Sequence, residues 1–284
     1  MLGKLIKHEF KGTVRIFVLM YAAMLILAAI NAVLLPLGDM TFVQWDNEVG
    51  QIFYGAIASL TMFLYVAVLC VVFVVTFVII VVRFYRMFGN EGYLWFTLPA
   101  TANQHLIAKM VVAFVWTVAS CLVAGISIGL ASISTGWVFE LHRIPEAWAE
   151  LVRDGFNPWL WLTLGAVTML TSWLQSITMY YAAIAIGPNI IKSRLGGSVL
   201  AYLALYIIVS ILSTILLTVL VVILNNQPTI ISDSLDTLSY MNTSAMVDYV
   251  LVVFMGGFSA LSLVLAAAFY ALTQYFMSRK LNLP

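Results

Sequence analysis

The stretch RFYRMFGNEGYLWFTLPATANQHLIAK, residues 83–109, separates two of the longest apolar runs in the chain. It begins and ends with basic residues, whereas the runs on either side are uncharged. Gly89 and Asn90 are turn and N-cap types, and Glu91 would place a carboxylate in the first turn of a short helix. Pro99 then ends that helix, because proline has no N–H and disfavours helical geometry in the residue before it.

A second helix is predicted directly after this break. Thr101 and Gln104 have the spacing of a capping box, in which each side chain satisfies a free N–H group of the first turn. The short helix before it carries a compact apolar surface of Tyr93, Leu94, Trp95, Phe96 and Leu98. We interpret residues 89–100 as a structured elbow that contacts another protein. The alternative is an interfacial loop whose aromatic side chains lie among lipid headgroups.

Composition identifies lipid as the solvent. The chain has 284 residues, of which 63% are hydrophobic and 9% charged, and its mean hydropathy is +1.06. Soluble domains carry about 25% charged residues. A net charge of +1 gives no indication of nucleic acid as a partner. Cys70 and Cys121 both lie in apolar runs, where they suggest neither a disulfide framework nor a metal cluster.

Six apolar segments are each long enough to cross a hydrocarbon core, which needs about 20 helical residues. The sequence therefore predicts an all-α integral membrane protein with a single transmembrane domain covering residues 1–284. The spans are expected near residues 16–37, 53–82, 107–137, 159–187, 198–224 and 248–277.

The distribution of charge predicts the orientation of these spans. With both chain ends in the cytoplasm, all of the 13 basic residues except Arg143 and Arg153 lie on the cytoplasmic side. Only Glu9 and Glu91 among the acidic residues would accompany them. This separation follows the positive-inside rule.

Residues 1–15 are expected to form an amphipathic helix on the inner membrane surface. Leu2, Leu5, Ile6, Phe10 and Val14 can share one face, and the other face is basic. Its cations Lys4, Lys7, Lys11 and Arg15 would reach anionic headgroups. An ordinary solvated helix start is the alternative.

Two outer segments carry further signals. Residues 144–155 have Pro145 at the first helical position and Gly155 just past the end, which predicts an interfacial helix. The polar loop 225–247 is compatible with a lid, a re-entrant segment or a plain connector.

Gly125 and Gly129 form a small-xxx-small pair in the third span, which allows another helix to approach closely. Packing within the chain is the favoured use, and a dimer seam is the alternative.

A search for catalytic groups finds no constellation. His8, His105 and His142 are dispersed along the chain, no span holds paired carboxylates, and no activated serine motif is present. Residues 187–193 lack the second glycine of a phosphate-binding loop. The spans offer only Asn31, Gln175 and Gln274 besides hydroxyls, so no buried charge is expected.

The elbow carries a family resemblance. Residues 91–99, Glu-Gly-Tyr-Leu-Trp-Phe-Thr-Leu-Pro, with Gln104 and Lys109 after them, resemble permease subunits of bacterial ATP-binding-cassette transporters of the type-two exporter class. The basic start and six spans extend the similarity along the chain. The resemblance implies a permease dimer in the bacterial plasma membrane, with the substrate path between its subunits.

In that family two separate ATPase subunits dock below the membrane and bind ATP and magnesium, so this chain is expected to hold no cofactor or metal and to be no enzyme. The resemblance makes the elbow a coupling helix, and residues 189–197 a possible second contact. The coupling residues are expected to be Asn90, Glu91, Tyr93, Leu94, Trp95, Phe96 and Leu98. The cargo is expected to be a peptide, an antibiotic or another amphipathic compound.

Two other functions remain open from the sequence. One is a membrane-embedded sensor or assembly factor that binds an ATPase without transport. The other is a lipid-modifying membrane enzyme, which would need a polar cluster at one interface.

Overall fold

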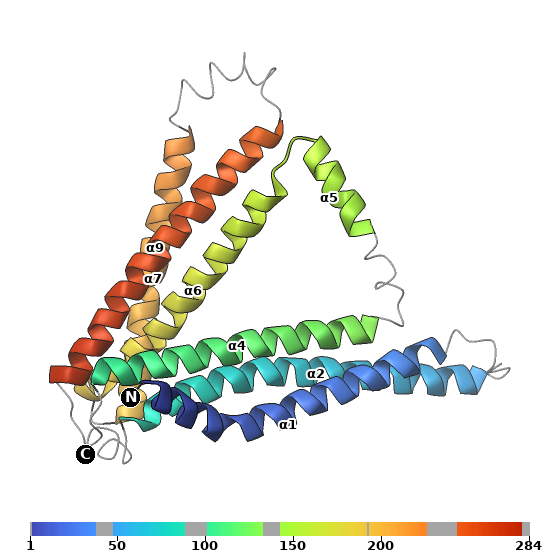
Figure 1. The fold of residues 1–284 in the computed structure, drawn as a ribbon, viewed down its shortest axis with the longest axis horizontal. Helices are drawn as coiled ribbons and strands as arrows, with labels where there is room; N and C mark the ends of the chain where they lie inside the picture. The colour runs from blue at the N-terminus through green and yellow to red at the C-terminus, as the bar shows by residue number, and fades with distance from the viewer. Residues whose placement is uncertain are drawn as a thin grey trace. The chain divides into compact units, whose positions relative to one another are not determined.

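A computed structural model describes residues 2–37, 48–88, 101–132, 143–191, 193–225 and 243–279. Every long element in these ranges is an α-helix (Figure 1). The chain divides into two compact units. The first holds α1 (Leu2–Leu37), α2 (Glu48–Arg86) and α4 (Ala102–Ser132). The second holds α5 (Ile144–Arg153), α6 (Pro158–Ile186), the short 3₁₀ helix η2 (Gly187–Asn189), α7 (Arg194–Asn225) and α9 (Thr243–Arg279).

The structure confirms the six long apolar helices that the prediction of six spans requires. Six helices are long and apolar enough to cross a membrane, and each includes most of one predicted segment. α2 has 39 residues, which at 1.5 Å per residue is about twice the thickness of a hydrocarbon core. The orientation with both ends in the cytoplasm, and the single transmembrane domain, stay predictions.

The first helix differs from the prediction. The expected boundary between an interfacial helix and a span, at residues 15 and 16, is absent because α1 runs without a break from Leu2 to Leu37. Figure 1 shows α1 bending in its N-terminal half. The Thr13 hydroxyl donates to the carbonyl oxygens of Glu9 and Phe10 on the preceding turn, an arrangement that often bends helices.

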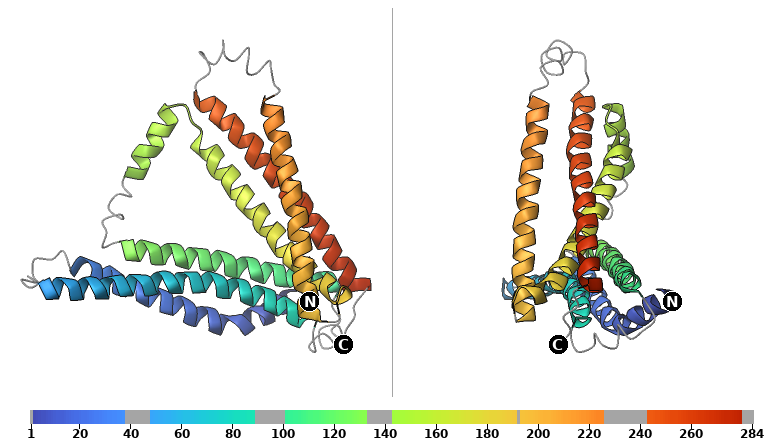
Figure 2. Two further views of the ribbon diagram at one scale, coloured as in Figure 1. Left: turned by 180° about the vertical axis from the view of Figure 1, so that it is seen from behind. Right: turned by 90° about the vertical axis from the view of Figure 1, so that its left-hand side faces the viewer.

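In the first unit, α1, α2 and α4 run side by side in alternating directions (Figures 1 and 2). Their apolar core is centred on Met24, Ala28, Tyr65 and Val72. Hydroxyl groups cross this core between helices. Ser120 Oγ lies 2.7 Å from the Tyr21 hydroxyl and 2.9 Å from Thr76 Oγ1, so one serine of α4 joins α1 and α2.

In the second unit, α6 packs against both α7 and α9. Figure 2 shows these helices lying closest together at the end that carries η2. Met179, Ala182, Leu265 and Phe269 form the buried core there. The turn into α7 needs small residues, because a Cβ atom on Gly197 would collide with the carbonyl oxygen of Gly187.

The prediction of a helix at 144–155 is confirmed, and its end is defined by hydrogen bonds. Phe156 N–H donates to Leu151 O at 3.0 Å and Gly155 N–H to Val152 O at 3.1 Å. Gly155 has a φ of 84°. These are the two bonds and the left-handed residue of a Schellman motif, which explains the glycine at this position.

Candidate functional site: an ion-paired helix junction beside the elbow

The predicted coupling residues lie outside the described part of the chain. Asn90, Glu91, Tyr93, Leu94, Trp95, Phe96 and Leu98 all fall between the described residues Phe88 and Thr101. The helix start after them is described. Gln104 N–H donates to Thr101 Oγ1 at 3.4 Å, which is the N-cap half of the predicted capping box.

The ends of the helices that flank the elbow meet α1 in a cluster of three charged side chains. Glu9 of α1 lies between Arg83, in the last turn of α2, and Lys109, in the second turn of α4. Its Oε2 is 3.3 Å from Arg83 Nε and its Oε1 is 2.9 Å from Lys109 Nζ. The Glu9 and Lys109 side chains are only 4% and 6% exposed. We call these three residues the ion junction.

Backbone carbonyl groups complete the ion junction. Arg83 Nη1 donates to the Glu9 carbonyl oxygen at 2.6 Å, and Lys109 Nζ donates to the Arg83 carbonyl oxygen at 3.2 Å. Each of the three helices is therefore bonded to both of the others: α2 to α1 through Arg83, and α4 to α1 and α2 through Lys109. Gly12 leaves space for the guanidinium, because a Cβ atom there would lie 2.6 Å from Arg83 Nη2.

The three charges of the ion junction depend on one another. Taking a charge out of water costs several kcal/mol, and only a well-placed partner offsets that cost. Glu9 has two cationic partners, so its carboxylate stays compensated despite its burial. Loss of either cation leaves Glu9 paired with the other, whereas loss of Glu9 leaves both cations without a carboxylate. Glu9 is therefore the group that ties the positions of the three helix ends to one another.

The ion junction corrects the expectation that no charge is buried. Lys109 is 7% exposed and lies within the predicted span 107–137, whereas its predicted place on the cytoplasmic side stays a prediction. A signal was present in the sequence: Glu9 is the one acidic residue in α1, and it shares a face with Ile6, Thr13 and Phe17 instead of the basic face. Its partners could not be identified from α1 alone.

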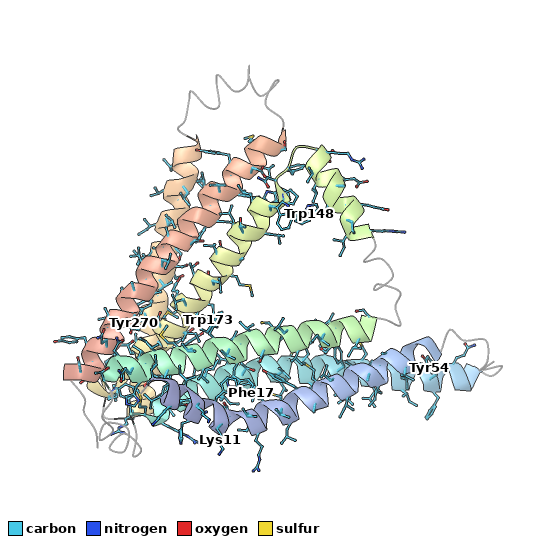
Figure 3. The ribbon with its side chains drawn as sticks, viewed as in Figure 1. Lys11, Phe17, Tyr54, Trp148, Trp173 and Tyr270 are labelled. Carbon is cyan, nitrogen blue, oxygen red and sulfur yellow. The ribbon has the colours of Figure 1, made fainter. Side chains whose placement is uncertain are left out.

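A layer of aromatic side chains lies directly beside the ion junction. The Trp116 ring of α4 stacks on Phe17 at a centroid distance of 4.0 Å and on Phe10 at 4.7 Å. Its Nε1 donates to Thr13 Oγ1 at 2.9 Å. In Figure 3, Phe17 lies on the side of α1 that faces α2 and α4. The layer extends the contact of α1 with α4 by about two turns.

The predicted basic face of α1 is exposed. Lys4, Lys7, Lys11 and Arg15 all lie on the surface, and Figure 3 shows Lys11 on the side of α1 away from α4. The exposure agrees with the predicted polar face, and the contact of these cations with lipid headgroups stays a prediction. Phe10, on the predicted apolar face, is partly buried because its ring packs against Trp116.

The glycine pair of α4 does not make the predicted close contact within the first unit. A Cβ atom on Gly125 or Gly129 would meet nothing within 4 Å. The buried positions of the same segment are Ala124, Ser127 and Ala131, and Ser127 Oγ lies 3.0 Å from the Tyr65 hydroxyl. A dimer seam at the glycines stays a prediction.

The second inner turn, residues 189–197, is described except for Lys192. Arg194 Nη1 donates to the carbonyl oxygen of Phe88 at 2.7 Å, a contact within the second unit. Among the described residues no group of three or more His, Cys, Asp or Glu side chains is placed to hold a metal ion. His105 is buried in the first turns of α4, with 2% exposure.

Comparisons of the sequence with protein-family models and with curated proteins found no match, and neither did a comparison with solved structures.

Proposed function

We propose that this multi-pass membrane protein is the permease subunit of an ATP-driven transporter of the type-two exporter class of ATP-binding-cassette systems. It works as a dimer in a bacterial plasma membrane and couples to separate ATPase subunits, which bind ATP and magnesium. The observation that carries the proposal is the ion junction. Glu9 binds the last turn of α2 and the second turn of α4, the helix ends on either side of the elbow.

A docking elbow needs firm attachment to the helices that it moves. Twelve residues, 89–100, connect the described ends of α2 and the cap of α4. Because both ends are held to α1 through one carboxylate, a displacement of the elbow shifts three helices as a group. A loop whose aromatic side chains only lie among headgroups would need no such attachment. This argument supports a coupling role for the elbow.

The roles within the elbow follow from its chemistry. Tyr93, Leu94, Trp95, Phe96 and Leu98 supply apolar and aromatic anchors suited to a groove in a partner. Asn90 is the N-cap that the sequence predicts for the short helix, and the proposed partner of Glu91 is a basic residue of the ATPase. Residues 189–197 form the second contact on the same side of the membrane.

The cargo is a peptide, an antibiotic or another amphipathic compound. A sensor or assembly factor that binds an ATPase without transport is the second candidate function, and ATP-dependent movement of cargo into sealed vesicles separates the two. A lipid-modifying enzyme needs reactive groups open to its substrate. Glu9 and Lys109 are paired and nearly buried, so the ion junction does not supply them.

The proposal is tested by purifying the full chain in mild detergent and identifying the proteins that accompany it. A stoichiometric cassette-type ATPase is expected. Glu91→Ala and Leu94→Asp should release it or abolish transport-coupled ATP hydrolysis while the amount of protein in the membrane stays unchanged. Glu146→Ala is the matched control, because Glu146 is an exposed acidic residue of α5 outside the elbow.

Two results would overturn the proposal. One is a chain that purifies alone although its unfolding transition shows that it is intact. The other is normal transport by both elbow variants.

A further inference from the structure

One face of α1 carries a shallow depression bordered by cations. Lys7, Phe10, Lys11, Val14 and Arg15 line it, and its volume is about 410 Å³. Lys7, Lys11 and Arg15 are spaced four residues apart, so they form one row along the helix. Phe10 and Val14 form an adjacent apolar row. The lining itself is almost wholly apolar, because Lys7, Lys11 and Arg15 contribute the aliphatic parts of their side chains to it beside Phe10 and Val14.

The position of the depression along α1 places it at the membrane boundary. No charged residue lies between Arg15 and Asp39, and the helix from residue 16 to residue 37 is long enough to fill a hydrocarbon core of about 30 Å. The residues before it are therefore at the level of the lipid headgroups. This step depends only on α1 being a membrane span and is independent of the transporter proposal.

The charge of the cation row is not neutralised along its own helix. Glu9 is the one acidic residue between Leu2 and Leu37, and its carboxylate is bound by Arg83 and Lys109. Lys7, Lys11 and Arg15 are exposed and lie within two turns of one another. Their mutual repulsion favours an anionic ligand.

We propose that this depression is a binding site for the headgroup of one anionic phospholipid. The phosphate faces Lys7, Lys11 and Arg15, and the first part of an acyl chain lies over Phe10 and Val14. A membrane lipid is the occupant because the apolar row and the headgroup level add to the charge complementarity. A free phosphate ion would leave Phe10 and Val14 exposed.

The site is connected to the ion junction through Phe10. The Phe10 ring lines the depression and also stacks on Trp116, which binds Thr13 one turn from Glu9. A bound lipid therefore holds Phe10 against Trp116. Anionic lipid should raise the thermal stability of the chain.

The test uses the full chain in nanodiscs of phosphatidylcholine with and without phosphatidylglycerol. Bound anionic lipid is counted by native mass spectrometry, and unfolding is followed by heating. Each lysine near an anionic surface contributes about 1 kcal/mol, which corresponds to about a fivefold change in affinity. Lys11→Gln should therefore weaken phosphatidylglycerol binding about fivefold, and the triple change of Lys7, Lys11 and Arg15 to Gln on the order of 100-fold.

Lys4→Gln is the matched control, because Lys4 is exposed on the same helix but does not line the depression. It should weaken phosphatidylglycerol binding and the stabilisation by phosphatidylglycerol less than Lys11→Gln does. Equal losses in Lys4→Gln and Lys11→Gln would show diffuse attraction and overturn the proposal. Displacement of the lipid by millimolar inorganic phosphate would assign the site to a free ion. The proposal is also refuted if phosphatidylglycerol leaves the unfolding temperature of the unaltered chain unchanged. Binding of an acidic protein to the cation row in the absence of lipid would refute it as well.

Discussion

Glu9 and Lys109 are 100 residues apart in the chain, yet Lys109 Nζ lies 2.9 Å from Glu9 Oε1 and both residues are buried. This pair joins the first helix to the helix that follows the elbow. Arg83 joins the same carboxylate from the helix that precedes the elbow. The three helix ends around the proposed coupling segment are thus fixed by one acidic side chain.

Lys109→Met should destabilise the protein by about 1–3 kcal/mol, because the hydrogen bonds of Lys109 to Glu9 and to the Arg83 carbonyl oxygen are lost while Arg83 still compensates the Glu9 carboxylate. The free energy of unfolding in mixed micelles measures this change. The double variant Glu9→Gln, Lys109→Met should cost less than the sum of the two single variants, since the contact between the two side chains is lost only once.

Lys4→Met is the control for the first prediction, and a change within about 0.5 kcal/mol is expected at this exposed position. Additive losses in the double variant would show that the two side chains do not interact. If the elbow acts through the ion junction, the double variant should fold but show weaker transport-coupled ATP hydrolysis.

Gly12→Ala should destabilise the first unit by no more than about 1 kcal/mol, because the added methyl group displaces the Arg83 guanidinium from Glu9, while that flexible side chain can shift and alanine favours the helix. The clash distance is 2.6 Å to Arg83 Nη2. Gly55→Ala is the matched substitution within a helix, with nothing within 4 Å, and it should be neutral or stabilising by up to about 1 kcal/mol. In an Arg83→Met background the cost of Gly12→Ala should disappear; an unchanged cost would place its origin elsewhere.

Trp116→Phe should cost about 1 kcal/mol, the usual contribution of one hydrogen bond, because Thr13 Oγ1 loses its donor while the ring stack remains. Trp116→Ala should cost about 3–5 kcal/mol, since it also empties the space between Phe10 and Phe17. Thermal or denaturant unfolding measures both. Trp159→Phe is the control, since Trp159 is 67% exposed. Equal effects of the two Phe variants would contradict the role of the Thr13 bond.

Gly197→Ala should destabilise the second unit by about 1–3 kcal/mol or more, because the new Cβ meets the rigid backbone of Gly187 and not a flexible side chain. Gly256→Ala in α9 is the comparison, since nothing lies within 4 Å of its Cβ position. Hydrogen exchange at the start of α7, or the accessibility of a cysteine introduced there, locates the effect. A loss of the same size at Gly256 would indicate a general effect of alanine and not the turn.

The six helices could be predicted from local pattern because of a simple constraint. In lipid a backbone must satisfy its hydrogen bonds within the segment, so a long uncharged apolar run has to be helical. Helix ends also follow from short motifs. Thr101 caps α4, Gly155 ends α5, and Asn157 with Pro158 starts α6.

The contacts of the helix faces could not be predicted in the same way. A span that is apolar all round does not reveal which side faces lipid and which faces protein, because both surroundings are apolar. The pair Gly125 and Gly129 illustrates this limit. Its spacing predicted close packing, whereas the contact face of α4 in the first unit runs through Ala124 and Ser127.

The sequence by itself determined that this chain is a helical membrane protein, where its helices lie and which face of α1 carries the exposed cations. The apolar runs, the capping residues and the four-residue spacing of Lys7, Lys11 and Arg15 are all local properties. Only the tertiary structure decided that Glu9 is buried and bound by Arg83 and Lys109, because its partners lie 74 and 100 residues away. A charge is assigned to water or to a protein interior by the groups that surround it, and those groups come together only when the helices pack.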